Sequence, residues 1–190
     1  MGNPLSEAGA FLVETLFGLY ILAVMLRFLL QWVRADFYNP ISQFLVKATN
    51  PPLLPLRRVI PGWMGIDLAA VVLMLVLQCL EWLMIAALRG VSLSLGALLV
   101  LSVAKLLSLL LDVFLFAILI QVVLSWVSPG THNSATALLY RLTEPLLGPA
   151  RRMIPPMGGL DFSPIAVLVG IQLLHILLIK PLLSWGLGLT

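Results

Sequence analysis

The chain has 190 residues, of which 61% are hydrophobic and 10% are charged, and its mean hydropathy is +1.10. Soluble domains are about 45–50% apolar and about 25% charged, and a chain of this size cannot hide so much apolar surface from water. These values exclude a soluble enzyme, a disordered tail and a secreted disulfide scaffold, and they indicate an integral membrane protein. The single cysteine, Cys79, excludes an intramolecular disulfide and a cysteine-cluster metal site, and we expect neither a metal nor a cofactor.

Four apolar stretches are long enough to cross a bilayer as helices, which takes about 20 residues each. They cover approximately residues 8–33, 68–88, 105–127 and 162–183. A shorter apolar stretch, 91–104, precedes the third span, and we interpret it either as a linker or interfacial helix at the outer surface or as an extension of that span. The sequence therefore predicts an all-α membrane protein with four transmembrane helices.

The two segments between paired spans, residues 34–67 and 128–161, carry ten of the thirteen prolines and seven of the eleven lysines and arginines. Short basic loops stay on the cytoplasmic side of a membrane. We therefore expect both segments to face the cytoplasm. Both termini are then expected on the periplasmic side of a bacterial inner membrane.

The sequence aligns with itself, without a gap, when it is shifted by 94 positions. The pattern T-x-P-x-L-x-P-x-R-R-x-I-P-x-x-x-G-x-D occurs at 49–67 and again at 143–161, which indicates an internal duplication. We expect one repeat over residues 1–90 and the other over 105–190. Because each copy holds two spans, the copies have the same orientation and are related by an axis along the membrane normal.

This motif, present twice between apolar helices, resembles the YggT family of small integral membrane proteins over nearly the whole chain. The resemblance implies the two-repeat membrane fold and supplies no agreed catalytic residues. It implies roles in osmotic-stress tolerance, in cell division or nucleoid organisation, or, from plastid relatives, in haem attachment to a photosynthetic cytochrome complex. The copies differ where Arg27 aligns with Gln121 and Pro52 with Leu146, so we do not expect them to be functionally identical.

Each connecting segment begins with a predicted amphipathic helix of about two and a half turns, suited to the membrane interface. Its expected cap is Asn39 in the first copy and Asn133 in the second. The predicted apolar stripes are Ile41, Phe44, Leu45 and Ala48, and Ala135, Leu138, Leu139 and Leu142. The prolines that follow predict extended or turning backbone, which completes a proline- and arginine-rich hairpin. Asp67 and Asp161 are expected to cap the next spans.

The arginine pairs have two interpretations. They either set the topology and anchor the protein to lipid, or they bind an anionic partner, which is a lipid headgroup, a nucleotide-like solute or an acidic protein face. The first is the leading interpretation, and the fixed spacing to proline and aspartate adds weight to the second, because topology requires charge but no spacing. The residues concerned are Arg57, Arg58, Arg151 and Arg152. We expect no nucleic-acid partner, because the segments lack a recognisable nucleic-acid-binding fold.

Ionisable residues within spans are costly and are functional candidates. At 1.5 Å per residue, Glu81, Asp112 and His175 share a level in the outer half of the bilayer, with Gln78 and Gln172 one turn below. We expect a polar cluster in which Glu81 faces His175. Its role is helix packing through hydrogen bonds, a proton or cation pathway, or contact with a substrate or haem.

The leading hypothesis from the sequence is a non-enzymatic scaffold or assembly factor whose basic cytoplasmic face binds anionic lipid or an acidic protein. Its partners would be membrane lipids, another membrane protein or further copies of the chain. The alternative is a small channel or transporter for ions or osmolytes, lined by the intramembrane polar cluster. No nucleophile–base pair or metal-ligand spacing indicates an enzyme.

Overall fold

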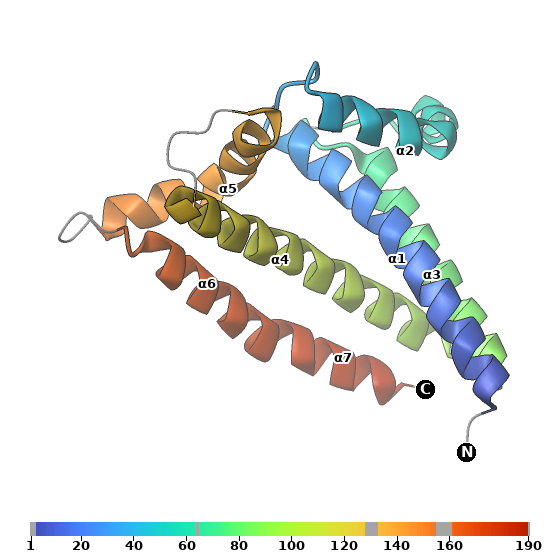
Figure 1. Ribbon diagram of the computed structural model, residues 1–190. Helices are drawn as coiled ribbons and strands as arrows, with labels where there is room; N and C mark the ends of the chain where they lie inside the picture. Colours follow the sequence, from blue (N-terminus) through green and yellow to red (C-terminus); the bar gives the residue numbers. More distant parts are fainter. Residues whose placement is uncertain (1–2, 64, 128–132, 155–160, 190) are drawn as a thin grey trace.

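The computed structural model describes residues 3–63, 65–127, 133–154 and 161–189, and these are helical apart from short connections (Figure 1). Four helical stretches are long and apolar enough to span a membrane, and two amphipathic helices connect them. The spans are α1 (Pro4–Trp32), α3 (Leu68–Arg89), α4 (Leu95–Val127) and the stretch Ser163–Leu187. The fourth consists of α6 (Ser163–Leu174), a π-helical segment η1 (His175–Ile179) and α7 (Lys180–Leu187). The connecting helices are α2 (Pro40–Val59) and α5 (Ser134–Met153). The predicted all-α, four-span architecture is confirmed.

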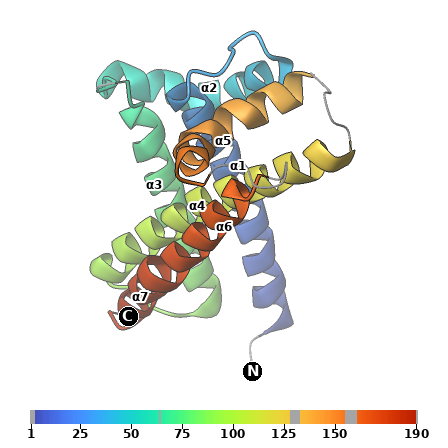
Figure 2. The same ribbon diagram turned by 90° about the vertical axis from the view of Figure 1, so that its left-hand side faces the viewer.

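The spans associate in two pairs. Helix α1 packs along α3, and α4 packs along α6 and α7, while contacts between α3 and α4 join the pairs. Figures 1 and 2 show the two pairs inclined to one another, with α2 and α5 together at one end of the bundle. Helix α1 begins, and α7 ends, at the opposite end. The order α1–α2–α3 is thus repeated by α4–α5–α6–α7, as the internal duplication predicts.

The core lies where the pairs meet and extends under α2 and α5. Ile21 and Ile118 come from the spans, whereas Leu53 and Leu147 come from the two connecting helices, and all four are almost completely buried. Outward-facing side chains of the spans, such as Phe11, are apolar and exposed. A protein whose apolar side chains face outward as well as inward is adapted to lipid rather than to water.

Residues 95–104 belong to the third span. Helix α3 ends at Gly90, which adopts a left-handed conformation with a φ of 65°, and α4 begins at Leu95. The Ser94 hydroxyl accepts a hydrogen bond from the Ala97 backbone N–H (3.1 Å) and so caps α4. No proline interrupts the helix from there to Val127. Within the stretch 91–104, residues 95–104 are thus continuous with the helix of the third span, and 91–94 form the connection between α3 and α4.

The prediction of extended backbone at the prolines is wrong. Helix α2 continues through Pro51, Pro52 and Pro55, and α5 continues through Pro145 and Pro149. Proline removes a backbone donor and crowds the preceding turn, so it bends a helix where packing holds both sides. In Figures 1 and 2 the two halves of α2, and those of α5, run in different directions.

The packed faces of α2 and α5 also differ from the predicted stripes. In α2 the buried residues are Ser42, Leu45, Thr49 and Leu53, whereas Ile41 and Phe44 are exposed. In α5 they are Thr136, Leu138, Leu142, Thr143 and Leu147. Each helix thus turns a mixed polar and apolar face to the span ends. Of the polar positions on that face, Thr49 and Thr143 contact the spans.

Candidate functional site

Helix α2 is joined to α1 by a buried hydrogen bond. The Arg27 guanidinium donates from Nη1 to Thr49 Oγ1 (2.7 Å) and to the Val46 carbonyl oxygen (3.3 Å). The Thr49 hydroxyl in turn donates to the Leu45 carbonyl oxygen (2.7 Å). Arg27 is 6% exposed and Thr49 is completely buried. Thr49, the first position of the repeated motif, therefore connects α2 to α1.

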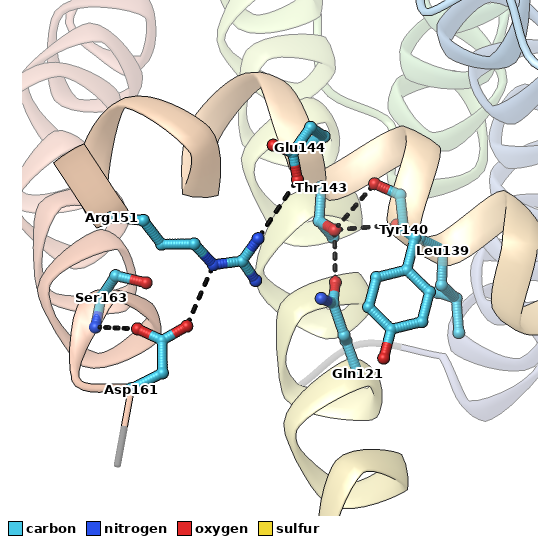
Figure 3. Close-up of polar contacts among 8 residues, drawn as sticks. All are labelled: Gln121, Leu139, Tyr140, Thr143, Glu144, Arg151, Asp161 and Ser163. Atoms are coloured by element: carbon cyan, nitrogen blue, oxygen red, sulfur yellow. Dashed lines mark hydrogen bonds and ion pairs between the residues drawn. The ribbon is translucent and has the colours of Figure 1, made fainter. Parts of the chain in front are cut away.

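The second repeat makes the equivalent contact with a different partner. Thr143 is hydrogen-bonded to the side-chain amide of Gln121 on α4, and its hydroxyl also donates to the Leu139 carbonyl oxygen at 2.8 Å (Figure 3). Thr143 and Gln121 are both buried. The difference between Arg27 and Gln121 therefore changes the charge at this position but keeps its hydrogen bond to threonine.

Arg57 at the end of α2 reaches the beginning of α3. Its guanidinium forms an ion pair with Asp67 and donates to Gln31 Oε1 (3.1 Å). The predicted capping role of Asp67 is present, because its other carboxylate oxygen accepts from the Ala70 N–H (3.3 Å). The chain turns back between Arg57 and Asp67, which are ten residues apart. Gly65 in this connection has a φ of 83°, which glycine adopts without strain.

Arg151 makes the matching contact in the second repeat. Its Nε donates to Asp161 Oδ2 (3.0 Å), and its Nη1 donates to Glu144 Oε2 (3.2 Å) (Figure 3). Asp161 precedes the N-cap residue, Phe162, by one position, and its carboxylate accepts from the backbone N–H of Ser163 (2.9 Å).

The Asp161 carboxyl group titrates below its usual range. Burial alone would raise its pKa, but the hydrogen bonds from Ser163 and the charge of Arg151 outweigh burial and lower it. The stability that this carboxylate contributes is therefore present above the unfolded-state pKa, near 3.8, and is lost as the pH falls through the lower folded-state pKa. The ion pair is fully formed at neutral pH.

The two arginines of each predicted pair have different surroundings. Arg57 and Arg151 are occupied by the aspartates, whereas Arg58 and Arg152 are exposed and have no ion-pair partner among the described residues. We use the term motif contacts for the hydrogen bonds of Thr49 and Thr143 to the spans, together with the two arginine–aspartate ion pairs. The motif contacts account for the fixed spacing of threonine, arginine and aspartate in the sequence.

The asparagine caps occupy the predicted positions. Asn39 Oδ1 accepts from the Ile41 N–H (3.0 Å), and Asn133 Oδ1 accepts from the Thr136 N–H (2.8 Å). Asn39 also donates from Nδ2 to the Ser134 carbonyl oxygen (2.7 Å). This last bond connects the beginnings of α2 and α5, so the two amphipathic helices form one continuous surface.

Glu81 is the centre of a charged group within the spans. It is completely buried and accepts hydrogen bonds from Gln78 Nε2 (2.8 Å) and Lys105 Nζ (2.6 Å). Lys105 also donates to Glu14 (3.0 Å) and lies 5.4 Å from the centre of the Trp82 ring. The charged side chains thus join α1, α3 and α4.

Asp112 and His175 form a separate group between α4 and η1. His175 Nε2 lies 3.4 Å from Asp112 Oδ1, and Ser108 Oγ donates to Asp112 (3.4 Å). Gln172 is exposed. The residues expected in one cluster therefore divide into two groups, and Glu81 contacts Lys105 rather than His175. Their similar depth, which the sequence gives, does not fix the direction in which each side chain points.

The described residues contain no group of three or more histidine, cysteine, aspartate or glutamate side chains placed to hold a metal ion. The arrangement supplies two other capabilities. The exposed arginines of α2 and α5 are available to anions, and the polar groups of the spans join helices through ion pairs and hydrogen bonds.

Comparison with known proteins identifies relatives along most of the chain. It is 47% identical to an uncharacterised protein of Pseudomonas aeruginosa over 180 residues, which are 94% of this chain and 91% of that protein. It is 38% identical to the uncharacterised protein YggT of Escherichia coli over 159 residues, which are 84% of this chain and 82% of that protein. The uncharacterised protein ycf19 of Porphyra purpurea is 33% identical over 67 residues, which are 35% of this chain and 70% of that protein.

No solved structure matches the chain. The family model described as CCB3/YggT matches it twice, at residues 6–88 and 100–182, and these two matches correspond to the two structural repeats. The chain therefore belongs to the CCB3/YggT family of proteins.

Proposed function

We propose that this protein is a non-enzymatic scaffold of the bacterial inner membrane, and that α2 and α5 bind anionic lipid headgroups on its cytoplasmic side. The observation that carries the proposal is the exposure of Arg58 and Arg152, which remain available for anions while the arginines beside them form ion pairs with aspartate. Guanidinium groups bind phosphate through paired hydrogen bonds.

The surface of α2 and α5 suits the headgroup layer. On α2 the apolar side chains of Phe44 and Val59 are exposed close in sequence to the exposed cations Lys47 and Arg58. Trp63, in the connection after α2, is also exposed. A helix with apolar and basic side chains lies in the membrane interface and binds anionic leaflets, and tryptophan concentrates at that level. These features support lipid as the ligand over an acidic protein.

The distribution of charge supports cytoplasmic placement of α2 and α5. Their end of the bundle carries most of the lysines and arginines, whereas Arg89 and Lys180 are the basic residues nearest the other end among the described helices. The positive-inside rule then places the beginning of α1 and the end of α7 in the periplasm. A scaffold here would act in osmotic-stress tolerance or cell division, which are the processes that the family resemblance implies.

The polar groups within the spans support a packing role. Each buried carboxylate or cation of the Glu81 group has an oppositely charged partner, which offsets the cost of removing it from water. The alternative function, a small ion or osmolyte channel, requires polar groups that line one continuous path. The Glu81 and Asp112 groups both include a residue of α4, but no hydrogen bond or ion pair among the described residues links one group to the other.

Replacement of the two exposed arginines tests the proposed lipid binding. In R58Q/R152Q we expect purified protein to retain about tenfold less phosphatidylglycerol than wild type, because each lost guanidinium removes charge-assisted hydrogen bonds to phosphate. The measurement is bound lipid by native mass spectrometry after incubation with phosphatidylglycerol or phosphatidylcholine. The control, R89Q/K180Q, removes the same charge at the other end. Equal lipid retention by both variants contradicts the proposal.

The orientation is tested with reporters fused to the C-terminus. We expect alkaline phosphatase to be active and green fluorescent protein to be dark there, because the positive-inside rule places this end in the periplasm. Fusions after Arg89 and within 128–132 provide internal references for the two sides. A fluorescent, phosphatase-negative C-terminal fusion would show that the topology is reversed.

Removal of the Lys105 charge tests the packing role of the Glu81 group. We expect K105M to lower the free energy of unfolding by about 3 kcal/mol, because Glu81 would remain buried without its cation. K180M, which removes an exposed lysine, should be close to wild type, and K105M/E81M should recover part of the loss. The measurement is thermal unfolding in detergent. Wild-type stability of K105M, together with a vesicle ion flux that E81Q/D112N abolishes, would favour the channel instead.

A further inference from the structure

A pocket of about 370 Å³ lies between the end of α1 and the first half of α2. Its polar lining consists of Arg27, Gln31, Arg34, Ser42 and Arg57, and its remaining walls are apolar. Arg27 lies five residues before the end of α1, about 8 Å along the helix axis. The pocket is therefore at the level where a membrane's headgroups meet its hydrocarbon. It is separate from the exposed surface that carries Arg58.

The pocket contains more positive charge than the protein neutralises. Of the three guanidinium groups, only that of Arg57 has a carboxylate partner, Asp67. Neither Arg27 nor Arg34 forms an ion pair among the described residues. Arg27 is 6% exposed, and a buried charge without a carboxylate in contact with it is unfavourable. A bound anion would remove that cost.

Further donors in the pocket lack partners. Arg27 makes both of its hydrogen bonds through Nη1, which leaves Nε and Nη2 available. Ser42 is 7% exposed, and its Oγ has no hydrogen-bond partner among the described residues. Arg34 has a φ of 51°, which is unusual for a side-chain-bearing residue and reverses the chain after α1. Arg34 lines the pocket from this turn, together with Arg27 and Arg57.

The second repeat supplies an internal comparison. The residues that align with the five polar positions are Gln121, Ser125, Ser128, Thr136 and Arg151. The first repeat thus has three arginines at these positions, and the second has one. The hydroxyl of Thr136, which aligns with Ser42, is used in the cap of α5 with Asn133. Both repeats keep the motif contacts, but at these five aligned positions only the first repeat has arginines without an ion-pair partner among the described residues. Attachment of the helix and membrane topology therefore do not explain Arg27 and Arg34.

We propose that this pocket is a specific binding site for one phosphate group, carried either by an anionic lipid headgroup or by a small soluble phosphate compound. Arg27 and Arg34 supply charge-assisted hydrogen bonds and Ser42 supplies a neutral donor. Guanidinium matches phosphate through paired N–H groups. The site does not depend on Arg58 or Arg152, so the proposed membrane scaffold and this pocket are tested separately.

The test is calorimetric titration of the purified full chain in nonionic detergent at constant ionic strength. The probes are inorganic phosphate, glycerol 3-phosphate and short-chain phosphatidylglycerol, with short-chain phosphatidylcholine for comparison. We expect saturable binding of one phosphate group per chain. Binding of the two soluble probes supports a soluble ligand, and binding of phosphatidylglycerol alone supports a lipid headgroup.

The decisive variant is R27Q/R34S, which installs the residues of the second repeat. We expect its Kd to rise about tenfold or more, because two charged donors are lost. Gln121 already makes the equivalent contact with a buried threonine, so the variant should fold, and R34S alone covers the case in which it does not. R89Q/K180Q, with the same loss of charge at the other end, should bind as wild type. Absence of saturable binding to every probe, or equal weakening in R89Q/K180Q, overturns the proposal.

Discussion

The amphipathic helices α2 and α5 depend on a small set of polar contacts that hold them across the ends of the spans. In each repeat a buried threonine is hydrogen-bonded to the preceding span, and an arginine at the far end pairs with an aspartate that begins the following span. Each of these helices packs on the protein with one face only, through leucines such as Leu53 and Leu147 together with the polar contacts. The motif contacts therefore hold each helix in position and, with it, determine which of its residues are exposed.

This constraint separates the motif into a structural part and a part available for binding. Arg57 and Arg151 are engaged within their repeats, whereas Arg58 and Arg152 point to the surroundings. Both parts are present in each repeat, and the copies differ instead in the span residue that meets the motif threonine. Arg27 and Gln121 are these residues. Both are hydrogen-bonded to a buried threonine, but only Arg27 adds charge to a pocket. The two repeats thus share an architecture and differ in the charge that they place beside the buried threonine.

The spans, their pairing into repeats and the capping asparagines could be predicted because apolar length, internal alignment and cap chemistry are local properties of the sequence. The path of α2 through its prolines could not, since burial of Leu53 beside them outweighs the local preference for extended backbone. The partner of Glu81 also escaped prediction. Residue spacing gives depth along a helix, but tertiary packing decides that Glu81 meets Lys105 and that Thr49 meets Arg27.

A double-mutant cycle on Arg57 and Asp67 tests most directly whether the repeated motif holds α2 to the spans. R57Q, D67N and the double variant are compared with wild type by reversible unfolding in detergent, and asparagine at position 67 keeps the helix cap. The account predicts a coupling energy of about 1–2 kcal/mol, because the Asp67 side chain is only 4% exposed in the pair. The same cycle on the more exposed Arg151 and Asp161 should give less than about 1 kcal/mol. A coupling energy of zero for Arg57 and Asp67 would contradict the claim that the repeated motif holds α2 to the spans.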